Sequence, residues 1–247
     1  MRGRPPGSPV MTQKWQDLLF LHWPFNPSLL RPLIPERFEI DTFDGRAWIG
    51  ITPFHLDDVR PTLLPALPGL SSFTELNVRT YVRYRGVPGS WFFSLDSSKL
   101  LPAAAARIFF MLPYYKASIR FARNYPEFSF SMKRSGTPAA EFRASWKAGE
   151  RLRDPDEHSP AFFLLERYCA FAVEGARTFQ IRIHHHPWIL DAAYVKIHSS
   201  TAISALGLLE PASDPIAYFA ESVEAEIWAP QEIKAEIQSE RLHIPIS

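Results

Sequence analysis

The chain has 247 residues, which is near the upper size for one hydrophobic core. Apolar residues make up 46% of it, enough for a packed interior. The formal net charge is only +1, so the chain lacks a strong long-range field, and neither nucleic acid nor an anionic membrane is expected as a partner. Cys169 is the single cysteine, which excludes an internal disulfide and favours a reducing, cytoplasmic location.

The N-terminal residues 1–10 are basic and rich in proline and glycine. No apolar run of signal-peptide length follows them, and no segment is long and apolar enough to span a bilayer. We therefore predict a disordered leader over residues 1–10 that is dispensable for stability. Residues 11–247 are predicted to form one domain, with a polar tail from about residue 231, because no composition break divides them.

A short helix is predicted near the start of the domain, because Asn26 can cap a helix whose first residue is Pro27. A hairpin with an Asp-Gly turn is expected over residues 38–54. Residues 56–71 are rich in proline and leucine and are predicted to form a loop.

A second strand pair follows over residues 73–85 and 90–97, and an alanine-rich helix over residues 98–111. The remaining segments are short strands and single helices. The strands are predicted over 114–122, 128–133, 141–147, 177–186 and 222–229, and the helices over 161–168, 202–208 and 215–218. Because strands outnumber singly inserted helices, the pattern indicates an α+β protein built on a mainly antiparallel sheet or barrel.

The strand predicted over residues 73–85 alternates between polar and apolar side chains. Successive side chains of a strand point to opposite faces, so its polar face is expected to carry Glu75, Asn77, Arg79 and Tyr81. Two interpretations remain open: a half-buried sheet with this face in water, or the wall of a pocket. An acid, an amide, a guanidinium and a phenol on one face suit a pocket that orients a small polar ligand.

The next strand, over residues 90–97, is predicted to repeat this arrangement, with Ser94 and Asp96 as further ligand-binding residues. Lys116 follows an aromatic pair in an apolar stretch. A desolvated lysine there could form a Schiff base with a carbonyl substrate. In the alternative and more common arrangement, the lysine stem lies along aromatic surface while the ammonium group stays in water.

His184 and His186 share one face of a predicted strand, so two metal ligands are geometrically possible. No third ligand has suitable spacing, and HExxH and cysteine–histidine clusters are missing, so no metal site is predicted. His22 is predicted to be a hydrogen-bonded histidine of the core or pocket rim. The dinucleotide-binding glycine motif, the P-loop and the nucleophile elbow are also missing, so no cofactor is expected.

Seven short segments in order resemble the YqjF-like family of uncharacterised bacterial proteins. They are LFLHW (19–23), FDGRAWI (43–49), FTELNVRTYV (73–82), FFSLD (92–96), LPYY (112–115), ERY (166–168) and HPW (186–188). The resemblance runs from residue 15 to about residue 230. It implies the fold of acetoacetate decarboxylase, a cone-shaped, barrel-like sheet around an internal cavity, and so strengthens the expectation of a pocket.

The resemblance does not carry the decarboxylase activity over. That enzyme uses a Schiff-base lysine beside a second lysine, immediately after a proline, so that a neighbouring cation activates the amine. In this chain Tyr114 and Tyr115 follow the proline, and Lys116 lies further along. The nearest replacements for the missing cation are Arg79 and Arg107. Glu75 is similar in position to the pocket glutamate of the decarboxylase.

Three functions are therefore compared. The first is a pocket that binds a small anionic or carbonyl-bearing metabolite. Arg79 would hold the anionic group, Glu75 and Tyr114 would orient it, and Asn77 would add hydrogen bonds. The second is a lyase or decarboxylase with Lys116 as the Schiff-base amine and Glu75 as the proton carrier. The third is a structural or partner-binding protein whose polar strand face meets solvent or another subunit.

Overall fold

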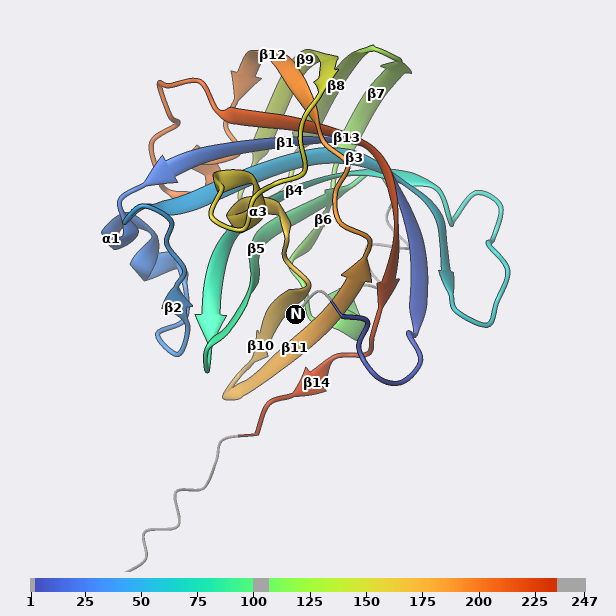
Figure 1. Ribbon diagram of the computed structural model, residues 1–247, viewed down its shortest axis with the longest axis vertical. Helices are drawn as coiled ribbons and strands as arrows, with labels where there is room; N and C mark the ends of the chain where they lie inside the picture. Colours follow the sequence, from blue (N-terminus) through green and yellow to red (C-terminus); the bar gives the residue numbers. More distant parts are fainter. Residues whose placement is uncertain (1–2, 100–106, 235–247) are drawn as a thin grey trace, which may run out of the picture.

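The computed structural model describes residues 3–99 and 107–234 (Figure 1). Hydrogen bonds connect the strands in the order β14-β11-β10-β5-β4-β3-β1-β13-β12-β9-β8-β7. A further pairing between β11 and β13 closes part of this order into a ring. The ring consists of β1 (Met11–Phe25), β3 (Ala47–Pro61), β4 (Phe73–Tyr84), β5 (Val87–Ser97), β10 (Cys169–Glu174), β11 (Arg177–His185) and β13 (Ile216–Ile227).

The remaining long strands continue from β13 as a second layer, which lies above the ring in Figure 1. They are β12 (Asp191–Ser200), β9 (Ala140–Arg151), β8 (Glu127–Arg134) and β7 (Ser118–Asn124). We call these four strands the second sheet. Apart from the β5–β10 and β5–β6 contacts, which are parallel, the pairings are antiparallel. The predicted fold class, a mainly antiparallel sheet with a few short helices, is therefore confirmed.

Short elements complete the described chain. They are α1 (Pro27–Leu30), η1 (Arg31–Leu33), β2 (Glu39–Ile40), β6 (Tyr114–Lys116), α3 (Pro160–Leu165), η2 (Ser204–Leu206) and β14 (Gln231–Glu232). The Asn26 side chain accepts a hydrogen bond from the Ser28 backbone amide, so it caps α1 as predicted. No helix within residues 3–99 or 107–234 is both long and apolar enough to cross a membrane.

The main core lies between the ring and the second sheet. Leu19, Ile51 and Leu76 from the ring belong to one buried cluster with Phe130 and Phe142 of the second sheet. Burying each such side chain stabilises the fold by about 1.5–3 kcal/mol. Because this cluster takes up the outward side chains of β1, β3 and β4, the inward side chains of the same strands are left to line the interior of the ring.

Several predicted elements differ from the observed ones. The expected hairpin over residues 38–54 keeps its turn, but β2 pairs with β4 instead of with β3. Residues 215–218 were expected to be helical, yet residues from Ile216 onward belong to β13. Strand pairing across the ring outweighs local preference there. β1, β10 and β12 were not predicted. β10 and the second half of β1 are buried on both faces, which removes the alternation that marks a strand.

Two predictions fall partly on residues outside the described ranges. The predicted helix over residues 98–111 includes residues 100–106, of which nothing is described, while residues 107–110 are helical. Of the predicted polar tail, Gln231 and Glu232 form β14 and pair with β11, and residues 235–247 lie outside the description.

The segment before β1 contacts the ring, which differs from the expectation of a leader that does not dock. The Gly7 carbonyl accepts a hydrogen bond from the Trp228 indole (3.3 Å), and the Pro9 carbonyl accepts one from the Thr62 hydroxyl (2.7 Å). The Val10 amide donates to the Ile227 carbonyl (2.8 Å). Backbone carbonyls, which composition does not report, hold this segment in place.

A chain that begins at Met11 is therefore expected to be less stable than the full chain. It loses the hydrogen bonds of Gly7, Pro9 and Val10, worth about 1–3 kcal/mol together, so its melting temperature should fall by several degrees. Thermal unfolding followed by circular dichroism measures this. Arg4→Ala is the control, because it removes an exposed ion pair with Glu226 and a cation–π contact with Trp228 (5.3 Å), both weak at the surface, but keeps the backbone hydrogen bonds, so it should change little. Equal melting temperatures for the short and full chains would contradict the expectation.

Candidate functional site

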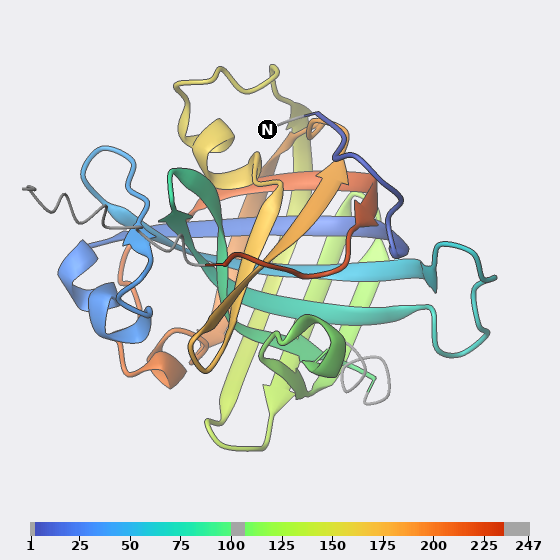
Figure 2. The same cartoon turned by 90° about the horizontal axis from the view of Figure 1, so that it is seen from below.

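A cavity of about 1000 Å³ lies inside the ring. β1, β3, β4, β5, β10 and β11 all contribute side chains to its wall, and Figure 2 shows these strands surrounding the interior. Most of the wall is apolar. Three of its polar side chains lie on β4; others come from β1, β3, β5, β6, β11 and the loops, including Arg167, which is paired with Asp41.

The inner face of β4 carries the predicted polar residues. Glu75, Asn77 and Arg79 all line the cavity, and Glu75 and Asn77 are only 2% and 5% exposed. Leu76 and Val78 point the other way, into the core beneath the second sheet. The β-strand repeat places Glu75 and Arg79 about 13 Å apart along the strand, with Asn77 between them. The polar strand face is thus enclosed and does not meet bulk solvent.

Four polar atoms of this region are buried and have no hydrogen-bond partner among the described residues. They are Thr52 Oγ1, Glu75 Oε2, Asn77 Oδ1 and Arg79 Nε. Thr52 of β3 lies directly opposite Asn77 in the strand pairing, and all four residues line the cavity. A buried polar atom without a partner costs about 1–3 kcal/mol, so such a group of atoms on one wall is typical of a surface that receives polar ligand atoms or water.

Burial dominates the electrostatics of Glu75. It raises the pKa of this carboxyl to about 8; a hydrogen bond from the Tyr114 hydroxyl opposes the shift, and the charge of Asp96 adds to it. Burial and the neighbouring Glu75 raise the pKa of Tyr114 well above its usual value. At neutral pH this pair is therefore a protonated carboxyl beside a phenol, and a protonated carboxyl can donate a hydrogen bond as well as accept one.

Arg79 brings a positive charge to the other end of the polar face. No ion pair among the described residues includes it, and its Cζ lies 5.9 Å from the ring centres of both Phe20 and Tyr81. Burial, followed by the charge of Arg79, lowers the pKa of His22 well below its usual value. A guanidinium with aromatic neighbours and no paired carboxylate is suited to binding an anion.

Tyr81 does not line the cavity, although it was predicted to bind ligand. Its hydroxyl is hydrogen-bonded to His22 Nε2 (2.8 Å), and the Arg167 guanidinium lies over its ring (5.0 Å). The interpretation of His22 as a hydrogen-bonded core histidine is confirmed by the same contact. Tyr81 shares the face of Arg79 on β4 but is buried in a cluster with Phe20, Trp48 and Leu164 next to the cavity.

Ser94 and Asp96 also lie outside the cavity, contrary to the expectation. In the β4–β5 pairing Ser94 is opposite Val78 and Asp96 is opposite Leu76, so both share the outward face of these residues. Asp96 is fully buried, 3.5 Å from Arg134 of β8. Burial raises the pKa of Asp96 to about 6, and Arg134 opposes the shift. The alternation along β5 was correct, but its register against β4 could not be inferred from the sequence.

Lys116 lies at the surface and not among the cavity residues. Its ammonium group donates a hydrogen bond to the Ser98 carbonyl. Tyr114, two residues earlier on β6, reaches the cavity beside Leu95, while the Tyr115 ring lies under the Arg134 guanidinium on the other face. No lysine lines the cavity within the described residues.

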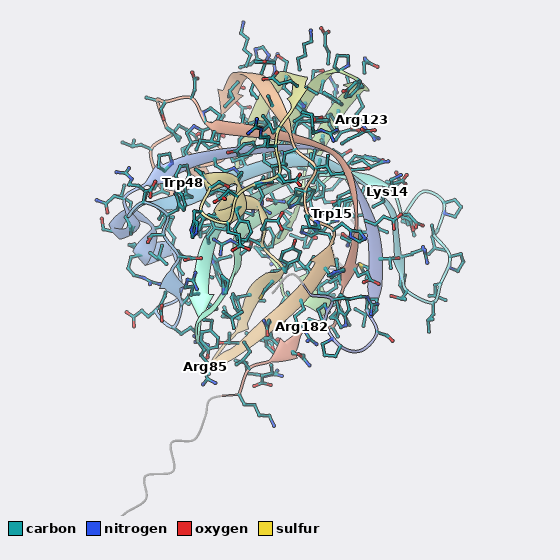
Figure 3. The ribbon with its side chains drawn as sticks, viewed as in Figure 1. Lys14, Trp15, Trp48, Arg85, Arg123 and Arg182 are labelled. Atoms are coloured by element: carbon teal, nitrogen blue, oxygen red, sulfur yellow. The ribbon has the colours of Figure 1, made fainter. Side chains whose placement is uncertain are left out.

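An aromatic group opposite the polar face was not predicted. His185 stacks on Tyr168 (ring centres 4.7 Å apart) and lies 4.7 Å from Trp188. Trp188 in turn stacks on Trp15, whose side chain lies toward the interior in Figure 3. His185 Nδ1 lies 2.7 Å from the His186 carbonyl, an acceptor, so Nδ1 carries the proton. Burial lowers the pKa of His185, so the neutral ring keeps Nε2 as an acceptor.

The sequence signal for this aromatic group was the segment HHHPW. The outer two histidines, His184 and His186, were considered as metal ligands, and the central His185 was not considered. Cys169 also lines the cavity; burial raises the pKa of its thiol to about 12, so the thiol is neutral. Within residues 3–99 and 107–234, no three His, Cys, Asp or Glu side chains are grouped closely enough to hold a metal ion.

Residues 12–224 match the DUF2071 family, which is described as an uncharacterized conserved protein. The chain is also 38% identical to the uncharacterized protein YqjF of Bacillus subtilis (strain 168) over 224 residues, which cover 91% of this chain and 93% of that protein. The chain belongs to the DUF2071 family. The predicted resemblance to YqjF-like proteins is confirmed.

Solved structures of similar fold include acetoacetate decarboxylase from Legionella pneumophila, with 15% identity and a TM-score of 0.63 over 93% of this chain and 88% of that one. The enduracididine biosynthesis enzyme MppR in complex with pyruvate has 12% identity and a TM-score of 0.64, covering 93% and 92%. An acetoacetate decarboxylase-like enzyme from Sphingomonas wittichii RW1 has 14% identity and a TM-score of 0.64, covering 93% and 95%. At these identities the likeness establishes the fold alone.

The raised pKa of Glu75 leads to a prediction about stability and pH. The carboxyl is protonated up to about pH 8 in the folded state but ionises near 4.3 when unfolded, so stability is lost as the pH rises through this range. Glu75→Gln, which stays neutral, should be more stable than the parent chain at pH 9 by a few kcal/mol, and nearly equal at pH 4. Denaturant unfolding at both values gives the difference.

Glu39→Gln is the matched control, because Glu39 is exposed on β2, and its effect should not vary with pH. If Glu75→Gln shifted stability by the same amount at pH 4 and pH 9, the carboxyl would already be ionised in the folded state and the buried, neutral assignment would be wrong.

Proposed function

We propose that the cavity binds an amphipathic carboxylic acid, with its carboxylate at Arg79 and its apolar body along the wall of the ring. The observation that carries this proposal is the group of four buried polar atoms without partners among the described residues, on Thr52, Glu75, Asn77 and Arg79, which line one mostly apolar cavity. A ligand carboxylate supplies acceptors for the guanidinium, and a carbonyl or hydroxyl further along the ligand can pair with Asn77 and Thr52.

The size of the cavity favours a ligand with a substantial apolar part. About 1000 Å³ is at the upper end of the range for small-molecule sites and far exceeds the volume of a three-carbon acid. Apolar ligand groups gain free energy in proportion to the apolar area that they remove from water. The polar residues therefore select the head group, and the wall contributes most of the affinity.

The proposal needs no covalent step. A Schiff base requires a lysine amine within reach of the substrate carbonyl, and Lys116 is turned toward the Ser98 carbonyl at the surface. MppR, one of the proteins of similar fold, has been solved with pyruvate, so a protein of this architecture binds a 2-oxo acid. In the present chain, the protonated Glu75 carboxyl accepts from Tyr114 and would donate its own hydrogen bond to a ligand carbonyl, without a covalent bond to it.

Replacing Arg79 tests the anion site. Arg79→Gln should raise the Kd for a fluorescent long-chain carboxylic acid about 10- to 100-fold, because a charge-assisted hydrogen bond to the carboxylate is lost. The corresponding long-chain alcohol should bind both proteins about equally. Arg143→Gln, an exposed substitution on β9, is the control. Equal affinity of the parent chain and Arg79→Gln for the acid would remove the basis of the proposal.

A second experiment separates binding from Schiff-base chemistry. Incubation with pyruvate or acetoacetate and borohydride should leave the intact mass unchanged, because no lysine lines the described part of the cavity. Lys116→Ala should likewise leave the affinity for the fluorescent acid unchanged. A stable adduct that maps to Lys116 and disappears in Lys116→Ala would instead support a lyase.

A further inference from the structure

Exposed apolar side chains are unevenly distributed over this protein. Among the described residues, six of the eleven large apolar side chains that stand exposed lie in two short segments. The first is the loop after β3, with Leu63 (95% exposed), Leu64, Leu67 and Leu70; the second is the helical segment at residues 107–110, with Ile108 (82%) and Phe109. We call these six side chains the apolar rim. A patch of this kind on a soluble domain marks an interaction surface.

The apolar rim surrounds the entrance to the cavity. Leu64, Leu67, Leu70 and Phe109 are exposed and also line the cavity wall. In Figure 2 the loop of residues 62–72 extends beyond the ends of β3 and β4 at the right, and the helical segment lies apart from it at the lower centre. Because four of the rim side chains are both exposed and part of the cavity wall, they mark where the cavity meets the surface.

Basic side chains accompany the apolar rim. Arg60 donates to the Leu64 carbonyl (3.5 Å), Lys99 donates to the Gly69 carbonyl, and Lys116 donates to the Ser98 carbonyl beside Lys99. Arg107 directly precedes Ile108. Two acidic residues, Asp57 and Asp58, lie on β3 just before the loop. The four basic residues therefore outnumber the acidic ones around the rim by four to two.

We propose that the apolar rim inserts into the surface of an anionic lipid bilayer, with the surrounding lysines and arginines at the head groups. The apolar rim presents exposed leucines and a phenylalanine with basic residues beside them. This combination suits the interfacial region of a membrane, where apolar side chains enter the acyl boundary and basic side chains contact lipid phosphates. The entrance of the cavity then opens against the layer in which an amphipathic acid accumulates.

A second copy of the chain suits this surface less well. A symmetric contact through the apolar rim would place the excess cations of each copy against the same cations of the other, which is unfavourable. The overall charge of +1 led to the expectation that membranes are excluded as partners. The net charge averages over the whole surface of the protein. Binding to a membrane depends instead on the local excess of basic side chains around the cavity entrance.

Vesicle flotation tests the inference without any cavity ligand, so its result is independent of the proposed function. The full chain should float with vesicles of phosphatidylcholine and phosphatidylglycerol at least about tenfold more than with phosphatidylcholine alone, and added salt should weaken this binding. A Leu63→Asp, Ile108→Asp variant, at two exposed rim side chains that do not line the cavity, should lose about tenfold or more in partitioning. A melting temperature and an affinity for the fluorescent acid in solution that equal those of the parent chain would show that the variant still folds.

The matched control is Leu209→Asp, which places the same charge at a side chain that is 89% exposed elsewhere. Its segment, after η2, lies on the opposite side of the molecule from the loop of residues 62–72 in Figure 2. Partitioning equal to that of the parent chain is expected. Absence of flotation in the parent chain would overturn the inference, as would equal losses in both variants. A dimer in sedimentation velocity that only the rim variant abolishes, without flotation, would assign the surface to a second copy.

Discussion

The two-sided burial of β4 is the constraint on which the rest of the structure depends. Its outward side chains, Leu76 and Val78, are needed in the core against the second sheet, and this fixes the register of the strand. Once that register is set, Glu75, Asn77 and Arg79 must point into the ring, whatever desolvation they suffer there. A polar cavity wall is thus a consequence of an apolar core on the reverse face of the same strand.

This arrangement costs stability at the cavity wall. Four polar atoms are held without partners, and a carboxyl is kept where only its protonated form is favoured. The core between the ring and the second sheet is large enough to offset that cost, because it gathers aromatic and aliphatic side chains from both layers. Strain of this kind commonly coincides with functional sites, since the ligand supplies the missing partners.

The alternation of side chains along single strands made part of the site predictable. The rest depends on how neighbouring strands pair, which the sequence alone does not show. Alternation along one strand was enough to place Glu75, Asn77 and Arg79 on one enclosed face. Ser94 and Asp96 were misplaced because the face they share with β4 depends on the register between two strands. Tyr81 obeyed the alternation but is packed against apolar side chains and His22 and does not line the cavity. The fold class followed from the number and spacing of strands, whereas closure into a ring rests on the β11–β13 pairing of distant segments.

The tyrosines after Pro113 change what the cavity can do. In the decarboxylase that the sequence resembles, two lysines follow the corresponding proline; an ammonium group beside a carboxyl would favour its ionised form. Here the groups that shift the pKa of Glu75 are burial, Tyr114 and Asp96, and no cation is among them within the described residues. Glu75 consequently stays protonated, and a hydrogen-bonded phenol–carboxyl pair with one proton left to donate stands where the decarboxylase has its lysines. Under the proposed function, this pair would hold a ligand carbonyl by a hydrogen bond and not by a covalent bond, and the permanent charge would come from Arg79, four residues further along β4.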